Sequence, residues 1–313
     1  MFRPLTTFAL LAPMLGNATP AIDPFPVDKV AAHTYVIHGP LEQPNPANKG
    51  FMNNPAFVVS DRGVIVIDPG SSVQIGRMVL QQIRTVTDKP VTHVFDTHIH
   101  GDHWLGNHAI RESFPTARFY AHPKMIQQAH AGIAQQWLDT MDRLTAGATR
   151  GTEAVIPAIA LADGQEFPIG GITLRIHIVA AAHSDTDAMF EVVEDSLLFT
   201  GDNVTYRRIP RLDDATFKGS LAACERALAL GVKTYVPGHG PTGDKAIVES
   251  YFGYLRTVYD EVARLNDEGL ADFEMKDRVA AKLGPYRSWA GFEQELGRHI
   301  SLALLEIERA TFE

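Results

Sequence analysis

The sequence is poor in cysteine. Its 313 residues include one cysteine, Cys224. No intramolecular disulfide bond can form, and a zinc site built from several thiolates is excluded. Cys224 lies in an apolar helical pattern, so we interpret it as a small buried residue and not as a nucleophile. Any metal ion in this chain must therefore be held by nitrogen and oxygen ligands.

The chain also lacks blocks of like charge and low-complexity segments. Hydrophobic residues make up 45% and charged residues 21% of the sequence, which is typical of a folded globular protein. Basic residues are scarce, since 28 Lys and Arg stand against 37 Asp and Glu, giving a net charge of −9. This balance argues against nucleic acid as a partner. We therefore expect the partner to be a small-molecule substrate.

The first 21 residues have the pattern of an export signal. Arg3 precedes an apolar stretch from Leu5 to Leu15, and small residues follow up to Ala21. The apolar stretch is too short to span a bilayer, so we expect no membrane attachment after the signal is removed. The prediction is a periplasmic or secreted protein. A cytoplasmic protein is the alternative if the segment is not a signal.

Strand and helix patterns alternate along the middle of the chain, and helical patterns fill its end. A strand pattern at 34–37 lies in a Pro- and Asn-rich region and is interpreted as an edge strand. The alternation then predicts strands at 56–60, 64–68, 91–95, 117–121, 172–179 and 234–236, and helices at 72–87 and 123–145. Residues 245–267, 275–283 and 289–310 are predicted helices that cover a sheet face. Because no linker is evident, we expect one domain over 22–313, with a helical C-terminal part at 244–313.

Side chains of the kinds that bind metals cluster directly after the predicted strand 91–95. The run HIHGDH begins at His98 and ends at His103. In an extended segment side chains two apart point the same way, so His98 and His100 can hold one ion. A turn at Gly101 directs Asp102 and His103 toward a second ion. Four such groups sharing a core pocket without a metal would be costly, so the run predicts a metal site.

Three further ligand candidates lie at the ends of later strand patterns. They are His183, Asp202 and His239, and each has a glycine or another small residue beside it. Each one alone is a weak indication, because a histidine next to glycine is common in loops. Together they would bring ligands from both halves of the chain to one edge of the fold.

The complete order HxHxDH, His, Asp, His resembles the metallo-β-lactamase superfamily from about residue 56 through residue 239. The resemblance implies an α/β fold, a four-layer αββα sandwich made of two similar halves. It also implies a first zinc ion on His98, His100 and His183, a second on Asp102, His103 and His239, and Asp202 as a bridge between both.

Asp202 stands where many true β-lactamases have Cys or Ser. A bridging aspartate is more similar to glyoxalase II, lactonases and the periplasmic zinc metallohydrolases associated with quinoprotein or sulfur oxidation. The last group is the nearest resemblance. It rests on the export signal, on the run DHWLGN from Asp102, and on the spacing between the GDN around Asp202 and the PGHGP around His239.

The expected reaction is metal-assisted hydrolysis. Two zinc ions about 3.5–4 Å apart can share a water and lower its pKa toward neutrality. We therefore expect a metal-bridging hydroxide to attack an ester, thioester, lactone or lactam carbonyl. Asp102 is the predicted catalytic residue, because it can orient the hydroxide and accept its proton. Iron or manganese in place of the two Zn²⁺ ions is the alternative cofactor.

Two other functions remain open at this point. One is an iron-containing oxidoreductase of the same fold that acts on sulfur compounds, and the other is a periplasmic accessory protein that binds a cofactor. A homodimer through the C-terminal helices is also an open alternative.

Several polar residues outside the predicted ligand set have two interpretations. Asp68, at the end of the strand 64–68, is either the partner of a ligand histidine or a turn cap. The segment with Tyr206, Arg207, Arg208 and Arg211 is interpreted as an exposed loop with solvated arginines. Binding of an anionic substrate by this segment is the alternative.

Overall fold

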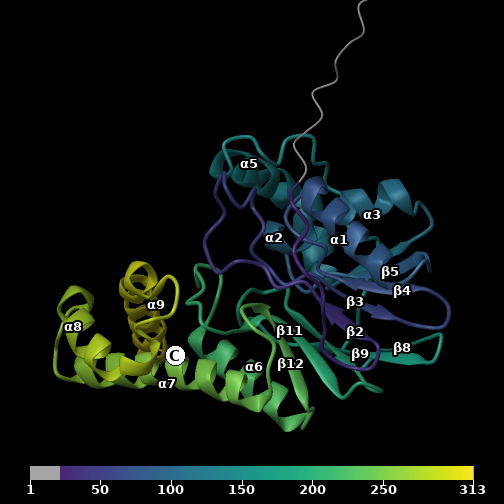
Figure 1. Cartoon of the computed structure of the whole chain (residues 1–313). Coiled ribbons are helices and arrows are strands. Elements are labelled where there is room, and N and C mark those ends of the chain that lie inside the picture. Colours follow the sequence, from purple (N-terminus) through teal and green to yellow (C-terminus); the bar gives the residue numbers. More distant parts are fainter. Residues whose placement is uncertain (1–21, 313) are drawn as a thin grey trace, which may run out of the picture.

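Two β-sheets pack against each other in the computed structural model, which describes residues 22–312 (Figure 1). In this part of the chain the first sheet has seven strands in chain order: β1 (Asp28–Lys29), β2 (Thr34–Val36), β3 (Ala56–Val59), β4 (Val64–Ile67), β5 (Val91–Phe95), β6 (Arg118–Ala121) and β7 (Ile159–Ala160). The second described sheet has five strands in the order β12 (Thr234–His239), β11 (Leu197–Thr205), β10 (Ala188–Val192), β9 (Ile172–Ile178) and β8 (Glu166–Ile169). The predicted export signal at 1–21 lies outside the described residues.

Helices cover the outer faces of both sheets. The helices of the described chain are α1 (Val73–Val86), α2 (Gly101–Trp104), α3 (Asn107–Ser113), α4 (Pro123–Gln128), the π-helical turn η1 (Ala129–Ile133), α5 (Ala134–Leu144), α6 (Phe217–Ala229), α7 (Lys245–Asp267), α8 (Asp272–Lys282), the 3₁₀ turn η2 (Gly284–Tyr286) and α9 (Phe292–Phe312). None of these helices is long and apolar enough to cross a membrane.

Apolar clusters hold the sheets and helices together, and three of them form the layers of the sandwich. Between the sheets, Ile67 and Phe95 of the first pack in one cluster with Leu174 and Phe190 of the second. A second cluster joins α1 and α3 to the outer face of the first sheet, and a third joins α6 and α7 to the outer face of the second. Burial of apolar side chains on both faces of each sheet produces the predicted αββα order of layers.

The connections between strands place the ligand candidates at one edge. β3 and β4, close to the predicted strands 56–60 and 64–68, form an antiparallel hairpin with Ala56 opposite Ile67. β4, β5 and β6 are parallel, so their carboxyl ends lie at the same edge of the sheet. The HIHGDH run begins three residues after the end of β5, at that edge.

The C-terminal helices extend the molecule beyond the sandwich. α7 has the predicted bounds and packs on β11 and β12, while α8 and α9 pack on α7 (Figure 1, yellow). Tyr254 of α7 and Ile300 of α9 are buried in the same apolar cluster as the outer face of the second sheet. The C-terminal part is therefore continuous with the core of the second half.

The fold differs from the sequence-based expectations at β2, in the stretch 123–145 and at Asp202. β2 is not an edge strand, because β1 pairs with its outer side. The helical stretch 123–145 is divided into α4, η1 and α5, with Gly132 at φ +113. Asp202 lies inside β11 and not beyond its end. As expected, Cys224 is buried in α6.

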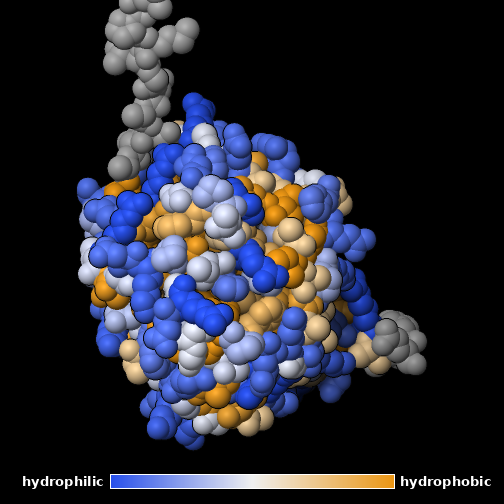
Figure 2. Space-filling model, turned by 90° about the vertical axis from the view of Figure 1, so that its right-hand side faces the viewer, coloured by the Kyte–Doolittle hydropathy of each residue, from blue (hydrophilic) through white to orange (hydrophobic). Residues whose placement is uncertain are grey.

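The surface is mixed in character. On the face drawn in Figure 2, hydrophilic side chains surround smaller hydrophobic areas. The exposed large hydrophobic residues of the described chain are Leu144, Phe273 and Leu305. They belong to three different helices, α5, α8 and α9.

Candidate metal centre

The residues predicted as metal ligands come together from both halves of the chain. Three groups have ligand atoms within 4.8 Å of one another: His98, His100 and His183; His98, His103 and Asp202; and Asp102, His103 and His239. The HIHGDH run comes from the first half, and the other candidates follow or belong to strands of the second sheet. The centre thus lies where the two sheets meet at their common edge.

One side of the centre consists of histidines alone. The Nε2 atom of His183 lies 3.0 Å from Nδ1 of His100, and the ring of His98 lies across both. His98 and His183 are buried, whereas the His100 side chain keeps 15% of its surface exposed. This side of the centre is therefore the more accessible to solvent.

The other side combines two histidines with two carboxylates. Nε2 of His239 lies 3.2 Å from Oδ2 of Asp102 and 3.2 Å from Oδ2 of Asp202. Nε2 of His103 lies 3.3 Å from Oδ1 of Asp202. Asp202 also approaches the first side, with Oδ2 3.5 Å from Nε2 of His183. Its carboxylate is therefore the group that contacts both sides of the centre.

Several buried atoms of the centre fit a bound metal ion. Nε2 of His98, Nε2 of His103 and Oδ1 of Asp202 are buried and have no hydrogen-bond partner among the described residues. Leaving such atoms without a partner costs free energy, and a cation would satisfy all three. Imidazole nitrogens and carboxylate oxygens suit zinc and also iron or manganese. The cluster is therefore able to bind metal.

Hydrogen bonds outside the centre orient two of the histidines. Nδ1 of His103 donates to Oδ2 of Asp68 over 2.8 Å. Thr97 Oγ1 donates to the same oxygen over 2.7 Å and lies 2.9 Å from Nδ1 of His98, from which it can accept. Both rings therefore turn Nε2 toward the centre. Of the two interpretations of Asp68, the structure favours the partner of a ligand histidine.

The remaining orienting contacts were not anticipated from the sequence. Nδ1 of His239 donates to the main-chain oxygen of Met52 over 2.8 Å, and Nε2 of His100 lies 3.0 Å from Oδ2 of Asp214. Trp137 of α5 packs on the His100 ring with 5.2 Å between centroids. No sequence pattern indicates that the main-chain oxygen of Met52 or the loop residue Asp214 would contact these histidines.

The electrostatics of the centre differ between its two sides. Burial opposes a positive charge on His103 and His239, but the neighbouring carboxylates raise the pKa of both. Burial lowers the pKa of His98 well below its usual range and that of His183 to about 3, so both rings are neutral. Burial opposes ionisation of Asp202, but His239, His103 and His183 together hold its pKa well below the ordinary value. Neutral imidazole and ionised carboxylate are the ligand forms for divalent cations.

One glycine gives Asp202 its position. A Cβ atom at Gly238 would lie 1.9 Å from Oδ1 of Asp202. Gly238 belongs to β12, beside β11, and only a residue without a side chain permits this close approach. Gly238, the small residue next to His239, thus leaves room for the Asp202 carboxylate on the neighbouring strand.

One interpretation of the loop after β11 was wrong. Arg207 and Arg211 are exposed as expected, but Arg208 is buried, with 3% of its surface exposed. The reason is that the chain turns after Thr205, whose hydroxyl donates to the Arg208 oxygen over 2.9 Å. This turn directs the guanidinium inward, beneath the main-chain oxygens of Leu41 and Glu42.

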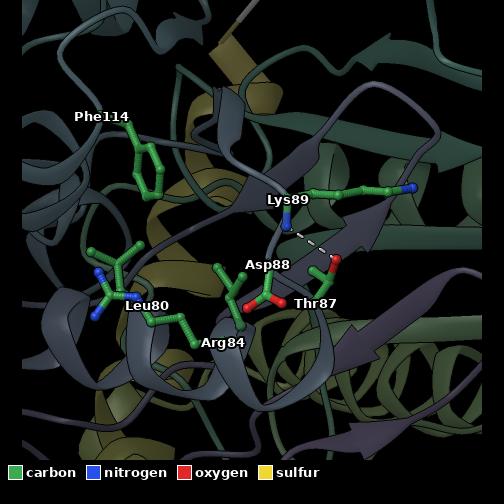
Figure 3. A pocket seen from close by; sticks show the side chains of 7 residues that line it. Leu80, Arg84, Thr87, Asp88, Lys89 and Phe114 are labelled. Atoms are coloured by element: carbon green, nitrogen blue, oxygen red, sulfur yellow. Dashed lines mark hydrogen bonds between the residues drawn. The ribbon is translucent and has the colours of Figure 1, made fainter.

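A hollow lies away from these residues. It is formed at the end of α1 by Leu80, Ile83, Arg84, Thr87, Asp88, Lys89 and Phe114 (Figure 3). Its floor is apolar, and Thr87 accepts a hydrogen bond from the Lys89 amide within it. None of its residues belongs to the three ligand groups, so it is not part of the metal centre.

Two packed sheets, with histidines and aspartates gathered at one edge, define a metal-binding α/β protein of the αββα class. Residues 49–239 match the sequence profile of the metallo-beta-lactamase superfamily, and the chain belongs to this superfamily. The superfamily resemblance inferred from the ligand pattern is thereby confirmed, and the named relatives are hydrolases.

Three relatives have similar sequences. A probable metallo-hydrolase of Streptococcus pyogenes is 26% identical over 60% of this chain and 79% of its own length. A linear primary-alkylsulfatase of a Pseudomonas strain is 23% identical over 74% of this chain and 50% of its own. An atrochrysone carboxyl ACP thioesterase of Pseudocercospora fijiensis is 25% identical over 61% and 48%. The chain thus spans about half the length of the last two relatives.

Solved structures agree on the fold. A metallo-beta-lactamase from Pontibacter korlensis superposes with a TM-score of 0.59 at 20% identity, covering 74% of this chain and 98% of that one. A double mutant of the sec-alkyl sulfatase PisA1 gives a TM-score of 0.69 at 14% identity, covering 90% of this chain and 49% of that one.

Proposed function

We propose that this protein is a dizinc hydrolase that cleaves an ester, thioester, lactone or lactam bond. The observation that carries the proposal is the convergence of buried nitrogen and oxygen atoms without partners on one point between the two sheets. In the proposed assignment His98, His100 and His183 hold one zinc ion, Asp102, His103 and His239 hold the other, and Asp202 contacts both.

The zinc ions would supply a water of lowered pKa and would polarise the carbonyl group of the substrate. The residues of the chain would orient the attacking water and accept its proton. Burial opposes ionisation of Asp102, but His103 and His239 hold its pKa below the usual range, so its carboxylate is ionised. An ionised carboxylate at this position can orient the attacking water and accept its proton.

The ligand histidines are fixed before a substrate arrives. Asp68 and Thr97 hold His103 and His98, and the Met52 oxygen holds His239. Each contact binds the nitrogen on the far side of the ring and leaves the other nitrogen directed inward. A centre prepared in this way needs little reorganisation during the reaction.

The relatives support hydrolysis but differ in the bond cleaved. Their printed names include a metallo-hydrolase, a thioesterase and alkylsulfatases. The substrate panel for this chain should therefore contain a primary alkyl sulfate beside an ester, a thioester, a lactone and a lactam.

The test begins with the metal content of the purified protein and continues with this panel. We expect two zinc ions per chain and turnover of at least one carbonyl substrate. Asp102→Ala and His100→Ala should lose turnover and metal while the chain still folds. His130→Ala is the matched control, because His130 is exposed on η1 and belongs to none of the ligand groups.

Two results would contradict the proposal. Full activity of the Asp102→Ala protein would refute the role of this carboxylate. A coloured, redox-active iron centre together with no hydrolysis of any panel member would favour the oxidoreductase alternative. A metal-loaded protein that hydrolyses nothing but retains a bound cofactor would favour an accessory role.

A further inference from the structure

The helical segment 123–145, which contains α4, η1 and α5, lies beside the histidine side of the candidate metal centre. Gln128 of α4 donates from Nε2 to Oδ1 of Asp185 over 2.9 Å, and Lys124 pairs with the same carboxylate over 2.6 Å. Asp185 follows His183 by two residues. These contacts therefore fix α4 to the loop that carries one of the predicted ligands.

The other end of the segment contacts a second predicted ligand. α5 lies beside α2, the short helix that begins at Gly101 (Figure 1). The indole ring of Trp137 in α5 packs on the ring of His100, with 5.2 Å between the centroids. A Cβ atom at Gly101 would lie 2.8 Å from Cβ of Trp137 and 3.0 Å from its Cγ. The glycine of the HIHGDH run therefore makes room for this indole.

Trp137 keeps part of its surface in water. The residue packs against the apolar cluster that contains Ile99 and Leu105, but it is only half-buried. Trp104 and Trp289, by contrast, have 0% and 8% of their surface exposed. An indole gains free energy when its apolar surface is buried. The exposed part of Trp137 therefore has an unused capacity for apolar contact.

Trp137 stands next to the accessible part of the centre. The His100 side chain on which the indole packs keeps 15% of its surface exposed, whereas His98 and His183 are buried. Ile133, four residues before Trp137 on the same side of the helix, is a partly buried apolar residue that packs on the same cluster. A ligand that reaches the centre past His100 therefore meets apolar side chains of this segment.

We propose that Trp137 is a specificity-determining residue, and that the natural substrate has an alkyl or aryl group next to the bond that is cleaved, which packs on the indole ring. A flat ring would gain most, because aromatic pairs attract each other beyond the effect of the buried area. The contact site for an apolar group follows from the position and exposure of Trp137 alone. Only the statement about the substrate rests on the proposed function.

The first experiment measures binding without catalysis. Acetohydroxamic acid and 2-phenylacetohydroxamic acid chelate zinc through the same hydroxamate group and differ by a phenyl group. Each is titrated into the zinc-loaded protein by isothermal calorimetry, and the wild type should bind the phenyl compound more tightly. Trp137→Ala should weaken binding of the phenyl compound about 10–30-fold and that of acetohydroxamic acid less than about threefold, because only the phenyl group reaches the indole.

Two variants control for aromatic character and for changes to helix α5. Trp137→Phe keeps an aromatic ring and should recover most of the affinity for the phenyl compound. Leu144→Ala removes an exposed apolar side chain from the same helix, about two turns further along, and should bind both compounds as the wild type does. Equal weakening of both compounds by Trp137→Ala would show that Trp137 only supports His100, and would refute the inference.

Fluorescence of the wild-type protein tests the contact directly and provides the test if Trp137→Ala does not fold. Acrylamide reaches exposed tryptophans more readily than buried ones, so quenching in the zinc-loaded protein should come mainly from Trp137. Saturation with 2-phenylacetohydroxamic acid should lower this quenching, and saturation with acetohydroxamic acid should not. Unchanged quenching in the presence of the bound phenyl compound would overturn the contact site.

The second experiment measures preference between substrates. Ethyl acetate is compared with ethyl phenylacetate, which has a phenyl group on the acyl side, and with benzyl acetate, which has it on the alcohol side. Acid release is followed at constant pH. Trp137→Ala should lower kcat/KM about 10–30-fold for the preferred aryl ester and less than about threefold for ethyl acetate. An equal loss for all the esters, at unchanged zinc content, would refute the inference about the substrate.

The two proposals fail in different ways. If the wild type binds the phenyl compound through Trp137 but hydrolyses none of these esters and no other panel member, the proposed hydrolysis fails and the apolar contact site stands. If the esters are hydrolysed and Trp137→Ala changes neither binding nor preference, the hydrolase stands and the contact site fails. Absence of binding by either hydroxamate would also overturn the contact site.

Discussion

Replacing Asp68 by Asn should separate the orientation of His103 from the folding of the chain. Asp68 is buried and has φ +48, a conformation that Asn adopts as readily as Asp. The substitution therefore keeps the shape of the side chain and its backbone. It changes one acceptor oxygen into a donor nitrogen, at the point where Nδ1 of His103 and Oγ1 of Thr97 both meet Oδ2 of Asp68.

The size of the effect follows from the tautomer of His103. When the side chain at position 68 presents a donor nitrogen, Nδ1 of His103 must accept a hydrogen bond. The ring proton then lies on Nε2, the atom directed at the centre, and prevents this atom from binding a metal ion. Metal binding would restore the Nδ1 proton and set two donors 2.8 Å apart. The loss of a hydrogen bond to a charged group corresponds to about 1.4–2.7 kcal/mol, or about 10–100-fold weaker binding of one metal ion.

The assay is a competition for zinc between the protein and a chromophoric chelator, with thermal unfolding of the metal-free protein as the check on folding. Asp214→Asn is the matched control. Asp214 contacts Nε2 of His100, but its side chain is 64% exposed, so water can replace it and the loss should stay below about threefold. Wild-type affinity for both metal ions in the Asp68→Asn protein would refute the reasoning.

Four further predictions concern packing, pH, reactivity and export. Gly238→Ala should displace Asp202 and lower the zinc content measured by mass spectrometry, while Gly297→Ala, where a Cβ meets open space, should not. Burial lowers the pKa of His299 to about 4. Its neutral form contributes stability that is fully present above about pH 6.5 and is lost as the pH decreases toward 4. In urea unfolding, the decrease in stability between pH 8 and pH 5 should be about 2 kcal/mol smaller for His299→Gln than for the wild type. The Cys224 thiol is buried and its pKa is raised, so a thiol reagent at pH 8 should label the unfolded chain and not the native one. Cell fractionation of the full chain should find a periplasmic protein lighter by residues 1–21, and an uncleaved cytoplasmic protein would contradict the predicted signal.

The ligand candidates could be predicted because their information is local. The HIHGDH run is recognisable as a metal-binding pattern within six residues. The later candidates, His183, Asp202 and His239, follow from their order along the chain. α7 was predicted with its correct bounds, since Asp244 caps its first turn and apolar residues recur at helical spacing through Leu265.

Other features depend on segments that are distant in sequence. Arg208 was interpreted as exposed because arginines in a loop usually are, and its burial results from contacts with Leu41 and Glu42, more than 160 residues away. The break at Gly132 was missed because the helical pattern continues on both sides of it. The role of Asp214 arises only where its loop comes near His100.

The β-bridge between Arg208 and Ala290 has a consequence for how such proteins diversify. Residue 290 and helix α9 lie outside the 49–239 region that matches the superfamily, yet they fix the loop that ends at Pro210. Changes in the C-terminal segment can therefore shift the loop beside the candidate metal centre without altering any of the predicted ligands.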